Sequence, residues 1–211
     1  MAVRCEFDHV VVACADLDQG AAWIRARLGA DVVPGGRHAA MGTHNRLLRI
    51  GPRAYLEVIA IEPGVPPPPR PRWFDLDTPA VQQRAARSPF VATWVVRTDD
   101  VTAAAREVPA VGEVLPFTRS QYRWQLTVPS DGALQFDGLL PSVIQWEGAM
   151  HPADSLPDAG CELLGLSLTH PRIDELRMLL APLGVQGPLE LASGAPQIAV
   201  RVRVLGSVRV L

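Results

Sequence analysis

The chain contains no lysine, because all 20 of its basic residues are arginine. Without a lysine amine it cannot form a Schiff base with a carbonyl substrate, nor supply the lysine of a phosphate-binding P-loop. The net charge is also small, at -2 over 211 residues. Such a chain has no general attraction to a phosphate backbone or an anionic lipid surface, so we expect no nucleic-acid partner.

Cysteine is scarce as well. The three thiols, Cys5, Cys14 and Cys161, are odd in number and show no C-x-x-C spacing, which favours a reducing compartment over a disulfide framework. No segment reaches the roughly 18 apolar residues of a membrane-crossing helix, and the first eight residues include charges. We therefore expect a cytoplasmic protein with no membrane partner.

What the chain does contain is one order of elements, repeated three times. Apolar strands begin at Phe7, Phe90 and Leu163, and each runs through a polar cap into a helix-patterned segment followed by further strands. The spacing of roughly 75–85 residues exceeds that of ordinary solenoid repeats and indicates duplicated modules. Modules that each bury one sheet face against another leave a cleft between them.

The boundaries follow from breaks in the pattern. Six prolines between residues 63 and 71 exclude a helix or an inner strand there, and Thr78 with Pro79 begins a short helix after them. We expect these segments: a β-α-β-β-β module at 1–62, the proline-rich connector and short helix at 63–89, a second module at 90–147, a linker at 148–160, and a shortened third module at 161–211.

The first module carries a recognisable motif, DHVVVACADLDQGAAWIRARLGADVVPGGRHAAMGTHNRLLRIG followed by AYLEVIAIEP. It resembles the glyoxalase-like branch of the vicinal oxygen chelate superfamily. The second module is similar in element order and in its PSVIQWEG segment, and the third only in topology. The resemblance implies an α+β fold of repeated βαβββ modules that form an open, partly closed barrel. It also implies a divalent metal in that barrel, which polarises a substrate with adjacent oxygens.

Two residues of the first module match the family's metal-ligand positions, His9 and Glu57. Strand alternation puts His9 on one face with Phe7, Val11 and Ala13. A carboxylate among apolar neighbours is costly to bury unless a partner or a metal compensates it. Imidazole with carboxylate suits Zn, Mn, Fe or Ni, but the pair could equally be a plain buried hydrogen bond.

The second and third modules depart from the pattern, because Ala92 and Leu163 stand where the resemblance would ask for a ligand. Gln145 is the candidate third metal ligand, on the last strand of the second module; Glu147 on the same face is the alternative, unless it only ends the strand at the surface. His44, in MGTHN, is the candidate catalytic residue, as a ligand or as a general base near neutral pH. Alternatively, His44 belongs to a polar turn that bonds its own backbone.

Further residues are candidates for substrate binding. Arg37 and His38 lie in a glycine-bearing connection that looks mobile, and Asn45 follows His44. Arg123 could grip a carboxylate or phosphate, as could two other arginines on inner strands. Trp73 follows the prolines and either covers the barrel mouth or anchors the connector.

Other aromatic and histidine side chains have plainer expectations. Tyr122, Trp124 and Trp146 could line an apolar pocket, although core packing is the default for such residues. His151, in the second linker, is expected on the surface.

Three functions are compatible with this sequence. The first is a metal-dependent lyase, isomerase or dioxygenase acting on a small oxygen-rich metabolite. The second is a metal-free protein of the same fold that binds and sequesters a small molecule. The third is an interaction protein without a site. Because modules pair, the odd third module suggests a homodimer in which it packs against its twin.

Overall fold

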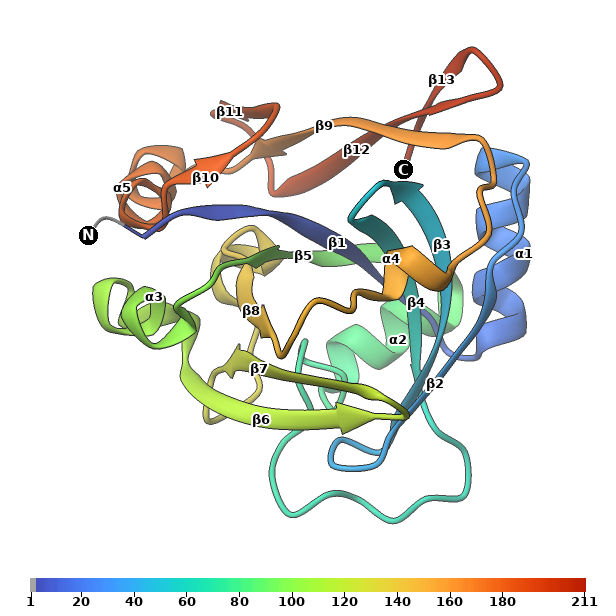
Figure 1. Ribbon diagram of the computed structural model, residues 1–211, viewed down its shortest axis with the longest axis horizontal. Helices are drawn as coiled ribbons and strands as arrows, with labels where there is room; N and C mark the ends of the chain where they lie inside the picture. The colour runs from blue at the N-terminus through green and yellow to red at the C-terminus, as the bar shows by residue number, and fades with distance from the viewer. Residues whose placement is uncertain (1–2) are drawn as a thin grey trace.

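The computed structural model describes residues 3–211 and shows an α+β protein with two sheets (Figure 1). The larger sheet has nine strands: β1 (Cys5–Ala13), β2 (Val33–His38), β3 (Thr43–Gly51), β4 (Ala54–Ile61), β5 (Phe90–Arg97), β6 (Glu113–Arg119), β7 (Tyr122–Val128), β8 (Ser142–Trp146) and β10 (Val185–Gln186). The smaller sheet has four: β9 (Cys161–Thr169), β11 (Leu189–Ala192), β12 (Gln197–Val204) and β13 (Ser207–Val210).

Five α-helices are found among the described residues: α1 (Leu17–Leu28), α2 (Pro79–Arg87), α3 (Val101–Glu107), α4 (Pro152–Ser155) and α5 (Ile173–Leu183). Their ends follow the sequence signals. Asp16 caps α1 by accepting from the Gln19 backbone N–H, and Gly29 ends it in the left-handed conformation. Thr78 caps α2 ahead of Pro79, as predicted. No helix within residues 3–211 combines the length and apolar character needed to cross a bilayer.

The first two modules form the larger sheet, and its curl confirms the predicted open barrel. Its order is β2-β3-β4-β1-β5-β8-β7-β6, with β10 added beside β1. In each module the first and last strands are parallel neighbours, β1 with β4 and β5 with β8. The antiparallel pair β1 and β5 joins the modules, and the sheet curls so that β2 approaches β6 (Figure 1).

A bulge in β1 decides which side chains face the inside of this curl. The pairing with β5 steps from Phe7 opposite Val96 to His9 opposite Val95, which leaves Asp8 without a partner on β5. An extra residue of this kind bends the strand and re-aims its neighbours. Phe7 consequently packs against the outer core, whereas Val11 belongs to the inner cluster. The expectation that Phe7 shares a face with His9 is therefore wrong.

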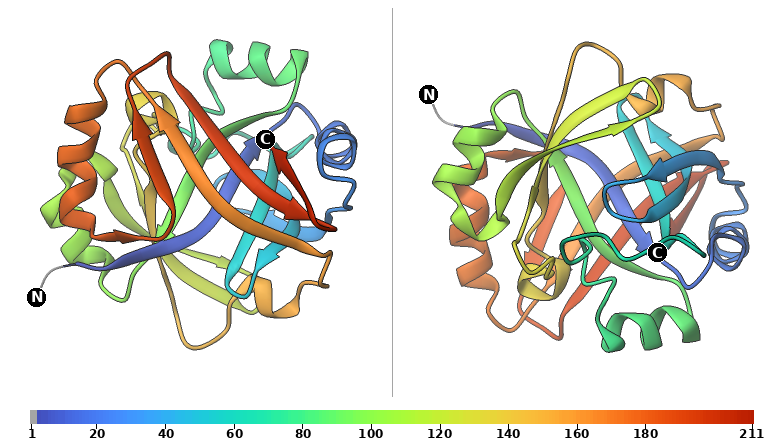
Figure 2. Two further views of the ribbon diagram at one scale, coloured as in Figure 1. Left: turned by 90° about the horizontal axis from the view of Figure 1, so that it is seen from above. Right: turned by 90° about the horizontal axis from the view of Figure 1, so that it is seen from below.

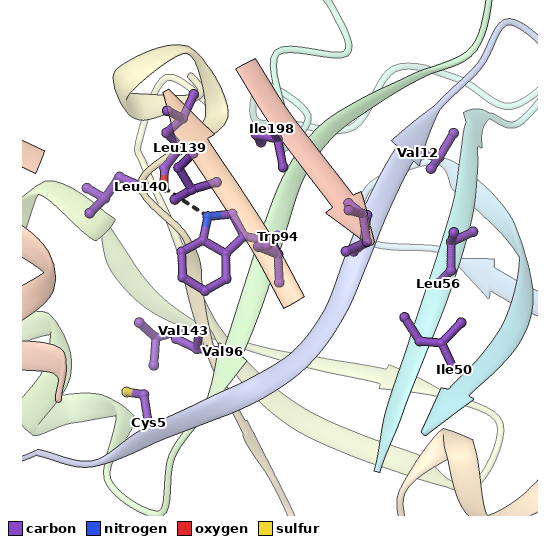
Figure 3. Close-up of a cluster of buried hydrophobic side chains, with 14 of the residues drawn as sticks. Cys5, Val12, Ile50, Leu56, Trp94, Val96, Leu139, Leu140, Val143 and Ile198 are labelled. Atoms are coloured by element: carbon purple, nitrogen blue, oxygen red, sulfur yellow. Dashed lines mark hydrogen bonds between the residues drawn. The ribbon is translucent and has the colours of Figure 1, made fainter. Parts of the chain in front are cut away.

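The C-terminal unit repeats the strand–helix–strands order but pairs its strands differently. Its sheet order is β11-β9-β12-β13, so the first strand lies between β11 and β12 instead of beside the last strand. Figure 2 shows this sheet lying across β1 and β5. One core cluster spans both sheets, and within it Trp94 Nε1 donates to the Leu139 carbonyl at 2.8 Å (Figure 3). The third unit thus packs against its own chain.

Candidate functional site

A small pocket opens inside the curl of the larger sheet, with a cavity volume of about 20 Å³. One end is polar and the other is aromatic and aliphatic. Its lining comes from both modules and from the connector after the prolines: His9, His38, Tyr55, Glu57, Trp73, Phe74, Arg119, Trp124, Leu126, Ile144 and Trp146.

Behind the polar end lies Asp8, which is fully buried and accepts three hydrogen bonds. Its Oδ1 is 2.7 Å from His9 Nδ1, and its Oδ2 accepts from Trp146 Nε1 at 2.9 Å and His151 Nε2 at 3.1 Å. Burial raises the pKa of Asp8, but the hydrogen bonds from His151 and His9 outweigh it and hold that pKa well below its usual range. Asp8 is therefore an ionised acceptor at neutral pH.

The Asp8 carboxylate sets the tautomer of His9. Because an ionised carboxylate can only accept, His9 Nδ1 carries a proton and Nε2 is the ring nitrogen left to face the pocket. The Tyr55 ring stacks on the imidazole with centroids 4.5 Å apart, which fixes the ring plane. A carboxylate behind a histidine in this way is the usual support of a metal-binding or proton-accepting imidazole.

Glu57 faces His9 from β4. Its Oε2 lies 3.7 Å from His9 Nε2, which is longer than a hydrogen bond. Its Oε1 accepts from Asn45 Nδ2, and Asn45 is itself held by the Gly36 backbone N–H at 2.9 Å. The geometry brings His9 and Glu57 to one hollow without a hydrogen bond between them.

His38 completes the polar end. It lies in strand β2 and is buried, which corrects the expectation of a mobile connection. Its Nδ1 is 3.0 Å from Thr43 Oγ1, and its Nε2 is 3.3 Å from Arg119 Nη1. Burial, followed by the charge of Arg119, lowers the pKa of His38 well below its usual value. His38 is therefore neutral at pH 7, with Nε2 accepting from the guanidinium.

Two side chains of the pocket are free to act as metal ligands, one fewer than a catalytic zinc site usually has. His9 Nε2 and Glu57 Oε2 are free to bind an ion, whereas His38 Nε2 already faces Arg119. The wall from the second module offers Arg119, Trp124, Leu126, Ile144 and Trp146, none of which is a metal ligand. Within residues 3–211 no three His, Cys, Asp or Glu side chains are grouped to hold a metal ion. A divalent ion here would need most of its ligands from substrate or water.

Five of the predicted site residues lie outside this pocket: Asn45, which bonds Glu57 from behind the pocket wall, and four others. Gln145 accepts from the Val101 backbone N–H at 2.9 Å, at the start of α3. His44 is on the face of β3 opposite Asn45. Arg37 forms an ion pair with Glu62, and Arg123 is exposed on β7; these four residues are absent from the pocket wall.

Trp73, Trp124 and Trp146 do line the pocket, whereas Tyr122 does not. Trp73 is 3% exposed and meets the His38 ring edge-on, with centroids 5.1 Å apart. It also packs on Phe117, so it both anchors the connector and forms part of the pocket wall. Trp124 and Trp146 contact each other across 5.4 Å.

Sequence analysis missed Asp8, Tyr55, Arg119 and His151. Simple alternation turns Asp8 away from His9, and only the bulge in β1 reverses this. His151 was expected on the surface, but it is fully buried, bonds Asp8 and caps α4. The adjacent Asp8–His9 pair was the one sequence signal that pointed to this arrangement.

The fold is similar to that of solved structures. A solved hypothetical protein from Staphylococcus aureus aligns with a TM-score of 0.62 and 14% identity, over 91% of this chain and 87% of that one. A variant of Streptomyces coelicolor methylmalonyl-CoA epimerase, in complex with 2-nitronate-propionyl-CoA, is 21% identical, with a TM-score of 0.43 over 70% of this chain and all of that one. The corresponding Mycobacterium tuberculosis epimerase is 22% identical, with a TM-score of 0.41 over 68% of this chain and 88% of that one.

No curated protein matches the chain. The sequence model of the glyoxalase-like domain family, in contrast, matches residues 7–184, which is most of the length. The protein therefore belongs to the glyoxalase-like domain family, within the vicinal oxygen chelate superfamily.

Proposed function

We propose that the protein is an enzyme that moves a proton on a small oxygen-rich molecule, with His9 and Glu57 at the reacting centre. One observation carries this proposal: an imidazole nitrogen, His9 Nε2, and a carboxylate oxygen, Glu57 Oε2, face each other across 3.7 Å in a buried pocket. At this separation the two side chains need a bridging hydrogen or a cation to interact with each other. A substrate proton or a divalent cation meets that need.

Of the two side chains, Glu57 is the better placed to act as the general base. Asn45 holds one of its oxygens, which leaves the other directed at the pocket. His9 is oriented through Asp8 and can take up or return a proton at Nε2. The aromatic wall excludes water and strengthens these electrostatic interactions. Abstraction of a proton beside a carbonyl, as in an isomerase or lyase, fits this arrangement.

A divalent metal ion, if present, would be held by His9 and Glu57 and would act as a Lewis acid toward adjacent substrate oxygens. Asp8 would then orient His9 as a metal ligand. Zn, Mn, Fe and Ni all suit an imidazole and a carboxylate. The free, buried thiols of Cys5, Cys14 and Cys161 favour a reducing cytoplasm as the place of action.

A metal-free binding protein of the same fold is the alternative. The observation that favours it is the second-module wall, which contributes aromatic and aliphatic side chains where a third metal ligand would be needed. Such a protein would bind a small molecule without changing it.

The test combines metal analysis with proton exchange. Untagged protein is loaded with Zn, Mn, Fe or Ni and dialysed, and bound metal is counted by mass spectrometry. Deuterium uptake from heavy water into small 2-oxo and 2-hydroxy acids is then followed by NMR, with and without metal. We expect the wild-type protein to catalyse this exchange. Glu57→Gln should lower the exchange rate at least about a hundredfold, which is the usual contribution of a general base.

Glu147→Gln is the matched control, since Glu147 is exposed beyond the end of β8. If wild-type protein exchanges no proton in any of these acids, with or without metal, the enzyme proposal fails. Thermal stabilisation by one of the acids without exchange would instead support the binding protein.

A further inference from the structure

We propose that Arg119 binds the carboxylate of the substrate, so that the molecule acted on is a small monoanionic 2-oxo or 2-hydroxy acid. This inference rests on the proposed function, because it takes the pocket of His9 and Glu57 as the substrate site. It adds a substrate class and a binding residue to that proposal.

Arg119 is a buried charge without an anion. It is 7% exposed and lines the pocket, yet no carboxylate oxygen in residues 3–211 lies within 4.0 Å of its guanidinium. The other buried arginine, Arg72, bonds Asp77 at 2.6 Å. Burying an uncompensated guanidinium is costly. A ligand anion in the adjoining pocket would offset that cost.

The structure holds this guanidinium in place from two sides. Arg119 ends β6 of the second module and crosses to β2 of the first, where Nη1 donates to the neutral His38 at 3.3 Å. Its side chain passes over Gly36, at which a Cβ would come within 2.8 Å of Arg119 Cδ. The lack of a side chain at Gly36 leaves the room that Arg119 occupies.

A carboxylate suits this position better than a phosphate does. A guanidinium presents parallel N–H donors that match the two oxygens of a planar carboxylate. Only one arginine lines the pocket, and the carboxylate of Glu57 lies in the same hollow, so a dianion is disfavoured. The aromatic wall of Trp124 and Phe74 can take the apolar part of the ligand.

The test compares lactate with lactamide, which has the same shape but no charge. Binding is followed by tryptophan fluorescence, since Trp73, Trp124 and Trp146 line the pocket, and by thermal unfolding, at ionic strength matched with NaCl. We expect wild-type protein to bind lactate at least about tenfold more tightly than lactamide, because a hydrogen bond to a charged group is lost in the amide. Inorganic phosphate should bind more weakly than lactate.

Variants assign the effect to one residue. Arg119→Gln should weaken lactate binding at least about tenfold and leave lactamide binding unchanged, while Arg119→Lys keeps part of the preference. Gly36→Ala should shift Arg119 and weaken lactate selectively, which covers the case in which Arg119→Gln fails to fold. Arg106→Gln, at an exposed position of α3, is the matched control and should bind as wild type does.

Equal binding of lactate and lactamide, absence of binding by both, or tighter binding of phosphate would overturn the carboxylate assignment. So would an unchanged preference in both Arg119→Gln and Gly36→Ala. The proposed function fails separately: selective lactate binding by a wild-type protein that exchanges no proton leaves the Arg119 site standing and removes the enzyme. Glu57→Gln should still prefer lactate over lactamide.

Discussion

At the scale of single residues, Asp8 decides whether the polar end of the pocket is organised. Three donors, from His9, Trp146 and His151, converge on its buried carboxylate. Asp8→Asn removes the charge and turns one acceptor into a donor that faces other donors. We expect a loss of about 2–4 kcal/mol in the free energy of unfolding at pH 7, measured by urea denaturation.

The control for this change is Asp31→Asn, an exposed carboxylate that bonds Arg25 on the surface. Surface ion pairs contribute little to stability, so the free energy of unfolding of Asp31→Asn should stay close to that of wild type. The role given to Asp8 would be untenable if both variants unfolded at the same urea concentration.

His38 gives the pocket a pH dependence with a definite sign. Burial and the charge of Arg119 lower its pKa in the folded state, whereas in the unfolded chain it titrates near pH 6.5. Below that pH His38 is protonated in the unfolded state but not in the folded state, so the free energy of unfolding falls as the pH falls. We expect wild type to lose up to about 1.4 kcal/mol per pH unit more than His38→Gln between pH 6.5 and the lowered pKa.

Urea denaturation at steps from pH 7.5 to pH 5 measures that difference. Parallel pH profiles for wild type and His38→Gln would show that His38 keeps an ordinary pKa.

Only part of the site could be predicted from single residues. His9 and Glu57 follow from the family resemblance, and Glu57 also lies in a regular stretch of β4, whereas His9 stands next to the bulge of β1. Asp8 does not follow from either, because nothing in the sequence marks the bulge that turns it inward. The Arg119 side chain contacts His38 on a strand of the other module. Contacts between residues so far apart in the chain leave no local sequence pattern.

At the scale of elements, strand β2 shows why His38 was first placed in a connection. Pro34, Gly35 and Gly36 have low strand propensity, and a register shift interrupts their pairing with β3. Such residues are tolerated on an edge strand, and β2 is at the edge of the larger sheet. The starts of β5 at Phe90 and of α2 at Pro79 agree with the predicted positions, because apolar periodicity and a capping residue mark them in the sequence.

Helix α1 offers a test of how closely an element packs. Gly20 faces β4, and a Cβ there would come within 2.3 Å of Val58 Cγ1 and 2.9 Å of Cys14 Sγ. Gly→Ala in a free helix stabilises by about 1 kcal/mol. At this contact the added methyl overpacks the interface, so we expect Gly20→Ala to destabilise by about 1–3 kcal/mol in thermal or urea unfolding.

The matched control is Ala22→Gly, the reverse change at an exposed position of the same helix. It should cost about 1 kcal/mol through helix propensity alone. If Gly20→Ala were more stable than wild type, helix α1 would not pack on β4 as closely as the structure shows.

At the scale of the whole molecule, the C-terminal sheet is a structural partner of the barrel and not a third barrel module. The sequence shows the order of its elements, but strand order depends on contacts far apart in the chain. Leu166, Leu168, Val200 and Val202 of that sheet share a core with Val10 of β1. The outer face of the larger sheet is buried by this contact, so the two sheets should unfold together.

That coupling is tested by Leu168→Ala. Leu168 is fully buried in β9, and removing its side chain leaves a cavity in the shared core, with an expected cost of about 2–5 kcal/mol. If the sheets form one cooperative unit, slow amide exchange in β1 and β5 should lose as much protection as in β9 and β12. Val208→Ala, on the exposed strand β13, should change the free energy of unfolding and the amide protection of either sheet by less than about 0.5 kcal/mol. Loss of protection confined to the smaller sheet would mean that the barrel folds without it, and the pocket of His9 and Glu57 would then depend on the first two modules alone.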